Sequence, residues 1–120
     1  MKNLLLIFLG GGIGSVARYL LSSYTQKFWT TGTFPLGTFV VNVIGCFLIG
    51  YFTSSFIKID HYLKFLLITG FCGGFTTFST FSVENYHLWQ SQNYITLFSY
   101  LFLSVFLGFL AVALGMKVGS

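Results

Sequence analysis

The chain has 120 residues, of which 55% are hydrophobic and only 7% are charged, and its formal net charge is +4 at pH 7. A water-soluble domain carries about 25% charged residues, so this composition excludes a soluble protein and predicts an integral membrane protein. The cations are scattered along the sequence, which excludes the basic stripe of nucleic-acid-binding proteins. Because a bilayer core takes about 20 apolar residues per helix, residues 1–120 are predicted to form one all-α domain of four transmembrane helices.

The first predicted transmembrane segment covers residues 3–24. Its beginning is similar to a signal peptide, with Lys2 before a short apolar run, but three further apolar segments follow, so we interpret it as a retained helix. Gly10 and Gly14 form a GxxxG pair, which favours close packing against another helix. Arg18 is expected either to extend to the membrane interface or to attract anions into a vestibule.

The second predicted segment covers residues 35–57 and follows a loop at 25–34. Pro35, the only proline, suits the first turn of a helix, where its missing N–H costs nothing. Asn42 lies mid-span, and we interpret it either as a helix–helix hydrogen-bonding residue or as an N–H donor that faces an anion. Small and polar residues share its helix face at a spacing of four, namely Thr38, Cys46, Gly50 and Ser54.

A short charged turn precedes the third segment and contains Lys58, Asp60, His61 and Lys64. The third segment covers residues 62–89, and its middle, 70–80, contains three glycines and four hydroxyl residues, which predict a break in the helix at the membrane midplane. Carbonyls freed by such a break are tolerated only inside the protein or facing water or an ion, and they bind cations such as sodium. Beyond the break, Phe78 and Phe81 share a helix face, and the positive edges of their rings suit a small anion.

Glu84 is the only acidic residue within the predicted apolar segments, and a lone membrane carboxylate raises a proton-coupled transporter as an alternative function. Because His87 and Trp89 follow it closely, we expect Glu84 near the membrane interface. The fourth segment covers residues 94–116 and carries, at a spacing of four, Thr96, Tyr100, Ser104 and Gly108. This pattern indicates either helix packing through small residues or a row of hydroxyl donors beside a pore.

The sequence shows no pattern that is typical of an enzyme. No Ser–His–Asp set, His/Cys cluster or carboxylate pair is apparent, so an enzyme is not expected. Cys46 and Cys72 lie far apart without a CxxC motif, which indicates small packing residues rather than a metal site or a disulfide. The lysines weakly favour both termini in the cytoplasm, but the excess is a few charges, so insertion in both orientations stays open.

Three motifs give the sequence a resemblance to a known family. They are Gly11-Gly12-x-Gly14-Ser15-x-x-Arg18-Tyr19, the stretch 37–50 with Asn42 at its centre, and Gly73-Gly74-Phe75-Thr76-Thr77-Phe78-Ser79-Thr80-Phe81. Together they resemble the Fluc (CrcB) family of microbial fluoride channels, and the third motif is the most specific of them. The likeness covers three helices by motif, and the whole chain by length and four-helix plan.

The resemblance implies an antiparallel, dual-topology homodimer with two pores, which exports fluoride from the cytoplasm across the inner (plasma) membrane by passive permeation. It implies a structural sodium ion (Na+) at the dimer centre, held by the main-chain carbonyls of Gly73 and Thr76. It places Arg18 and Glu84 in the vestibule or near a pore mouth. The fluoride pathway that it implies comprises Asn42, Phe78, Phe81, Ser79, Thr80, Tyr100 and Ser104. The expected partners are therefore fluoride, a second copy of the chain and the lipid bilayer, and no nucleic acid.

Two other classes of membrane protein are alternatives to the channel. A small multidrug transporter is similar in length, helix number and frequent dual topology, but that class carries a carboxylate in the first helix, where this chain has Arg18 and no acid. A non-transporting membrane subunit would leave the pattern of Phe and hydroxyl residues without a purpose. The sequence therefore favours the channel.

Overall fold

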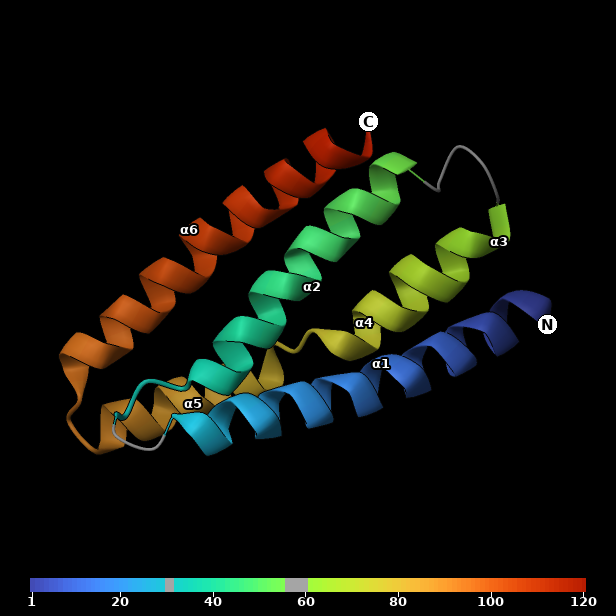
Figure 1. The fold of residues 1–120 in the computed structure, drawn as a ribbon. Helices are drawn as coiled ribbons and strands as arrows, with labels where there is room; N and C mark the ends of the chain where they lie inside the picture. Colours follow the sequence, from blue (N-terminus) through green and yellow to red (C-terminus); the bar gives the residue numbers. More distant parts are fainter. Residues whose placement is uncertain (30–31, 56–60) are drawn as a thin grey trace.

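Four long apolar spans make up the protein in the computed structural model, which describes residues 1–29, 32–55 and 61–120. By length and composition each span is able to cross a membrane, and the four are Lys2–Phe28, Leu36–Ser55, Lys64–Gln90 and Tyr94–Gly119. The described ranges contain helices and connecting turns and no strand (Figure 1). The predicted all-α fold with four long apolar segments is therefore confirmed.

The first helix, α1 (Lys2–Phe28), continues four residues beyond its predicted end at residue 24. The side chain of Gln26 explains this extension, because its Oε1 accepts the N–H of Gly37 at 3.2 Å and its Nε2 donates to the carbonyl of Trp29 at 3.3 Å. The polar residues that predicted a loop from residue 25 onward thus include one that joins the end of α1 to the start of the next helix.

The second helix, α2 (Leu36–Ser55), begins one residue after Pro35, whose carbonyl accepts the N–H of Phe39 at 3.2 Å. Pro35 therefore lies just before the first turn instead of within it, a difference of one residue at a helix end. The predicted end of this segment at residue 57 lies outside the described residues, as do Lys58 and Asp60 of the predicted charged turn.

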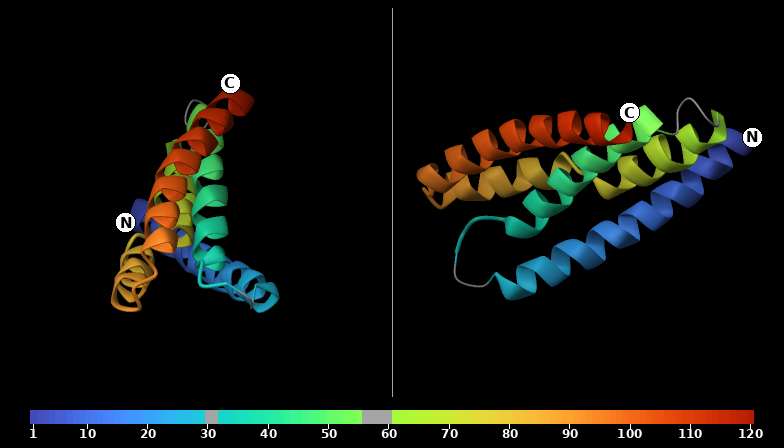
Figure 2. Two further views of the ribbon diagram at one scale, coloured as in Figure 1. Left: turned by 90° about the vertical axis from the view of Figure 1, so that its left-hand side faces the viewer. Right: turned by 45° about the horizontal axis from the view of Figure 1, so that its top comes forward.

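The last helix, α6 (Tyr94–Gly119), ends three residues beyond its predicted end at 116. Its final turn packs against the end of α2, where the hydroxyl of Ser55 donates to the carbonyl of Gly119 at 2.9 Å. Figure 2 shows α2 and α6 side by side along their length. Glycine permits this close approach, because a Cβ at Gly50 would collide with the carbonyl of Val112.

The third span is built from several helical pieces. They are α3 (His61–Leu63), the π-helix η1 (Lys64–Cys72), α4 (Gly73–Phe75) and α5 (Ser79–Gln90). Residues 76–78 link α4 to α5 and belong to neither helix, with Thr76 in an extended conformation at φ −89° and ψ 157° (Figure 1). We call residues 76–78 the link. The π-helical geometry of η1 was not predicted, since the hydrophobic pattern of this stretch carries no sign of it.

Helix α1 packs against η1 and α4 through main-chain contacts at glycines. Gly10 and Gly14 are the buried residues of α1. A Cβ at Gly10 would collide with the carbonyl of Leu66, and a Cβ at Gly14 would collide with the carbonyl of Phe71. The close packing that the GxxxG pair predicted is therefore confirmed, and it fixes α1 directly against the third span.

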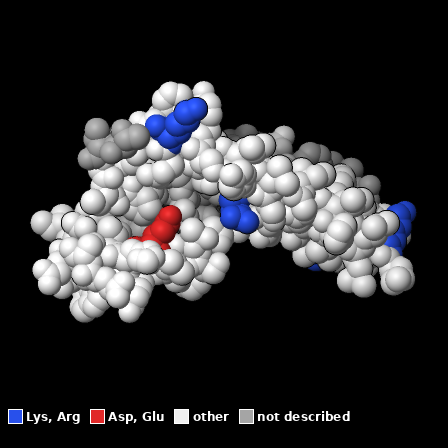
Figure 3. All heavy atoms as spheres, turned by 90° about the horizontal axis from the view of Figure 1, so that it is seen from below, with Lys and Arg blue, Asp and Glu red and all other residues white. Residues whose placement is uncertain are grey.

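The outer surface of the chain is apolar. Large side chains of α1 and α6 are widely exposed, among them Phe8 at 75% and Ile95 at 86%. Figure 3 shows a face on which charged side chains are few and isolated. A small buried cluster of Leu88, Leu97 and Tyr100 joins α5 to α6. Because the exposed side chains have the polarity of lipid tails, this surface suits a bilayer rather than water.

Candidate functional site

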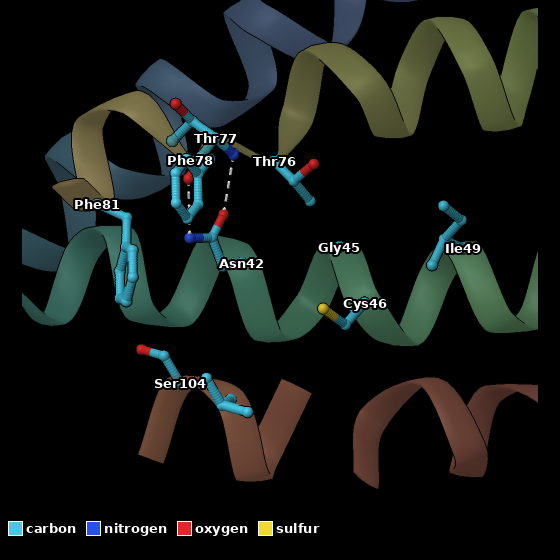
Figure 4. Close-up of a pocket in the computed structure, with 10 residues that line it drawn as sticks. Asn42, Gly45, Cys46, Ile49, Thr76, Thr77, Phe78, Phe81 and Ser104 are labelled. Atoms are coloured by element: carbon cyan, nitrogen blue, oxygen red, sulfur yellow. Dashed lines mark hydrogen bonds between the residues drawn. The ribbon is translucent and has the colours of Figure 1, made fainter. Parts of the chain in front are cut away.

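The link is held by an amide side chain from another helix. Asn42, on α2, accepts the N–H of Thr77 at its Oδ1 (3.0 Å) and donates from its Nδ2 to the carbonyl of Thr77 (3.2 Å). Figure 4 shows the two bonds as a parallel pair. The carboxamide thus replaces main-chain partners that Thr77 lacks outside a helix. Asn42 therefore bonds α2 to the link of the third span, and its expected role as an N–H donor to an anion stays a prediction.

Arg18 also contacts the main chain beside the link. Its Nε donates to the carbonyl of Gly74 at 3.0 Å, across 56 residues of sequence. Neither interpretation of Arg18 from the sequence, the interface or the vestibule, anticipated this bond. The motif did contain a signal for it, because Arg18 follows Gly10 and Gly14 at a spacing of four, so the three lie on one face of α1.

A cavity of about 360 Å³ lies beside the link. It brings together four of the residues predicted for the pathway, namely Asn42, Phe78, Phe81 and Ser104. They come from α2, α5, α6 and the link, and Figure 4 shows them around one space. Other atoms of its wall belong to Gly45, Cys46, Ile49, Thr76, Thr77 and Val105. Segments far apart in the chain thus line one cavity, whose wall is mostly apolar and contains a few polar groups.

Two hydrogen-bond donors of this cavity are uncommitted. The Nδ2 of Asn42 has two hydrogens, and its one described bond, to Thr77, uses one of them. The Oγ of Ser104 is buried and has no hydrogen-bond partner among the residues that the structure describes. A buried hydroxyl without a partner is costly, so the cavity suits a small guest that accepts hydrogen bonds.

Two aromatic rings form the apolar part of the cavity wall. The ring centroids of Phe78 and Phe81 lie 6.0 Å apart with an interplanar angle of 39°. Phe78 is 78% exposed, whereas Phe81 is half-buried and its ring lies 4.8 Å from that of Tyr100. The predicted pair therefore lies together, with one ring on the open side of the cavity and one toward the interior.

Glu84 is bound by two hydroxyl donors. Thr38 donates from Oγ1 to its Oε2 at 2.9 Å, and Tyr100 donates from its hydroxyl to its Oε1 at 2.8 Å. Both donors are buried, and Tyr100 is fully so. A second cavity, of about 270 Å³, is lined by Glu84 together with Thr33, Pro35, His87, Leu88, Ser91 and Asn93. Reasoning from the sequence placed Thr38 on the face of Asn42 but missed its bond to this carboxylate.

Of the remaining predicted residues, only Thr76 lines the cavity. Ser79 is exposed, and its Oγ lies 3.3 Å from Oγ1 of Thr77. Thr80 is half-buried, and its N–H donates to the same Oγ1 at 3.4 Å. Gly73 is exposed at the start of α4. Cys46 and Cys72 are free thiols; Cys72 is buried in packing, whereas Cys46 lines the cavity.

Four apolar spans, three of which line a cavity with uncommitted donors, define a small polytopic membrane protein of the channel or carrier class. Residues 5–116 match the family described as CrcB-like protein, Camphor Resistance (CrcB), and the chain belongs to this family. The resemblance drawn from the three motifs is thereby confirmed.

Curated relatives match the chain over nearly its full length or all of it. It is 51% identical to a fluoride-specific ion channel FluC of Flavobacterium psychrophilum, over 100% of this chain and 98% of the relative. It is 54% identical to a protein of the same name from Phocaeicola vulgatus, over 96% of each chain. A third, from a Hydrogenobaculum species, is 44% identical over 98% of each chain.

Proposed function

We propose that this chain is a fluoride-selective ion channel, not an enzyme, through which fluoride leaves the cytoplasm by passive permeation. The observation that carries the proposal is the cavity at the link, with its uncommitted donors. It lies in a chain that is 51% identical, end to end, to a protein named for fluoride conduction. Fluoride is small and strongly hydrated, so several close hydrogen-bond donors are needed to replace its water.

The cavity supplies such donors without a fixed positive charge in its wall. The free N–H of Asn42 and the hydroxyl of Ser104 would donate to the ion, and the positive ring edges of Phe78 and Phe81 would flank it. Neutral donors bind an anion less tightly than a cationic side chain does, which permits rapid release. Ser79, Thr80 and Tyr100 would extend the polar track, with Glu84 nearer a pore mouth.

The working unit that we propose is an antiparallel, dual-topology homodimer in the inner membrane. The exposure of Phe78 supports a second copy, because a ring that lines an ion path needs a protein wall on its open side. The link occupies the centre of the third span, Lys64–Gln90, which supports a break at the middle of the bilayer. Non-helical backbone at that depth is tolerated only where protein, water or an ion covers it.

The main-chain oxygens of Gly73 and Thr76 suit a sodium ion. In a continuous helix Gly73 would accept from Thr77 and Thr76 from Thr80. Here the N–H of Thr77 donates to Asn42 and that of Thr80 donates to the Thr77 hydroxyl. Both carbonyls thus lose their helical donors, and hard cations take such oxygens as ligands. Sodium at the dimer centre would supply positive charge that holds the two links together.

A flux measurement tests the proposed function. Liposomes that contain the purified protein and a sodium salt are loaded with potassium fluoride or potassium chloride. Efflux is recorded after addition of a potassium ionophore, which lets potassium leave with the anion and so prevents a charge imbalance. We expect rapid loss of fluoride while chloride is retained, as in protein-free liposomes. Equal loss of both anions contradicts selectivity. Fluoride movement that requires a proton gradient favours the transporter and makes Glu84 the next residue to test.

Removal of sodium is expected to weaken both assembly and flux. Replacing Na+ with N-methylglucamine leaves the carbonyls of Gly73 and Thr76 without a cation, because the organic ion is too large to reach them. The dimer fraction is measured by size-exclusion chromatography and fluoride efflux in parallel, and readdition of Na+ is the control that should restore both. Unchanged assembly and flux after exhaustive dialysis count against the sodium site.

A further inference from the structure

We propose that Arg18 is a positioning residue, which fixes the link through the carbonyl of Gly74 and so sets the position of Phe78 before an ion arrives. The role rests on the proposed function, because the position of Phe78 matters for flux only if the cavity conducts an ion. It differs from the vestibule role expected from the sequence, since Arg18 acts through the main chain and not through its charge on a passing anion.

The main chain of Arg18 is itself held firmly. Gly10 and Gly14, two turns and one turn earlier on the same face of α1, contact the main chain of η1 without space for a Cβ. The contact continues at α4, where a Cβ at Gly74 would collide with the carbonyl of Gly11. The main chain at Arg18, from which the guanidinium extends, is therefore fixed in position, because it lies one turn beyond the contact at Gly14.

The Gly74 carbonyl requires a donor because of the link. In a continuous helix this oxygen would accept the N–H of Phe78, four residues later. Helix α4 ends at Phe75, and Thr76 is extended, so the helical pattern stops. Arg18 supplies the missing donor at 3.0 Å. A carbonyl at membrane depth without any donor would be strongly unfavourable, so this bond stabilises the link in its non-helical form.

Arg18 and Asn42 hold opposite ends of one short stretch. Arg18 reaches Gly74 from α1, while Asn42 reaches Thr77 from α2. Phe78 follows Thr77 directly and forms the open side of the cavity. Its ring position thus depends on both ends being fixed. Arginine suits this role better than lysine, because its Nε–H belongs to a rigid planar group whose charge is permanent.

The amino-acid sequence permits a direct test by selective isotope labelling of the unmutated protein. Arg18 is the only arginine, and the glycines that precede a phenylalanine are Gly70, Gly74 and Gly108. Labelling with ¹⁵N-arginine, ¹³C-carbonyl glycine and ¹⁵N-phenylalanine therefore limits the glycine carbonyl signals to these three in solid-state NMR in bilayers, and only that of Gly74 is expected to lie beside Arg18. We expect dipolar coupling between this carbonyl and Nε of Arg18 that corresponds to a hydrogen bond. Absence of this coupling overturns the proposal, whether or not the protein conducts fluoride.

Two variants then distinguish the effect of the Arg18 hydrogen bond on flux from the effect of positive charge on α1. Arg18→Lys keeps the positive charge and loses the planar Nε donor, so we expect the Gly74 signal to shift, the Gly108 signal to stay, and fluoride flux to fall about tenfold. Lys27→Gln, on the same helix, is the matched control that removes a charge and should change neither. Wild-type flux and an unshifted Gly74 signal in Arg18→Lys overturn the role, as does equal loss of flux in Lys27→Gln. Lack of flux in wild type, with the coupling intact, refutes only the channel.

Discussion

Asn42→Asp is expected to lower fluoride flux by about 100-fold or more. The amide holds both main-chain groups of Thr77, at 3.0 and 3.2 Å. Aspartate keeps the acceptor but loses the donor, and it sets a carboxylate oxygen against the Thr77 carbonyl. A buried carbonyl without its donor costs about 1–3 kcal/mol, and each 1.4 kcal/mol is about tenfold in rate. The new negative charge also repels an anion from the cavity, so both effects act in the same direction.

The measurement is fluoride efflux from liposomes at equal protein content, with assembly checked by size-exclusion chromatography. Asn3→Asp is the control, because it makes the same chemical change on α1, among residues that do not line the cavity. We expect that control to conduct as wild type does. An assembled Asn42→Asp protein with wild-type flux would remove Asn42 from the pathway. Loss of flux in Asn3→Asp would show that added charge alone is responsible.

Gly14→Ala is expected to lower the free energy of unfolding by about 1–3 kcal/mol, whereas Gly12→Ala should leave it unchanged or raise it. Both glycines lie inside α1 and differ by half a turn. A Cβ at Gly14 would collide with the carbonyl of Phe71, a main-chain atom that cannot rotate away. A Cβ at Gly12 meets nothing within 4 Å, so alanine there contributes only its better helix propensity.

Unfolding of the two variants is followed by circular dichroism in the same detergent against a denaturant. Because Gly12→Ala carries an identical substitution in the same helix, it corrects for helix propensity and leaves the packing effect. Equal stability of both variants would mean that α1 does not rely on close main-chain contact with the third span. It would also weaken the case for Arg18, whose position depends on that contact.

Hydrophobicity is a property of each segment by itself, which is why the sequence predicted the four spans. A run of apolar residues about as long as the bilayer is thick has to become a helix, since a helix satisfies its own main-chain groups. The GxxxG pair of Gly10 and Gly14 was likewise predictable as a close-packing face, because small residues at a spacing of four have few other uses. The same holds for the pairing of Phe78 with Phe81, which are three residues apart.

Helix ends were less predictable than helix centres. Polar residues from position 25 onward indicated a loop, but α1 continues to Phe28 because Gln26 bonds to Gly37 and Trp29. The end of α6 extends to Gly119 because Ser55 of α2 donates to it. In both cases the deciding contact comes from outside the predicted segment, which no local pattern contains.

The sequence by itself determined that this protein is a membrane protein with four apolar spans, with polar residues near the middle of the third, and it determined the family. Only the tertiary structure decided which hydrogen bonds join the polar residues of the four spans. Asn42 binds Thr77, Arg18 binds Gly74, and Thr38 and Tyr100 bind Glu84. The physical reason is that a hydrogen bond requires two groups within about 3 Å in the right direction. Packing brings such groups together from helices that are far apart in sequence.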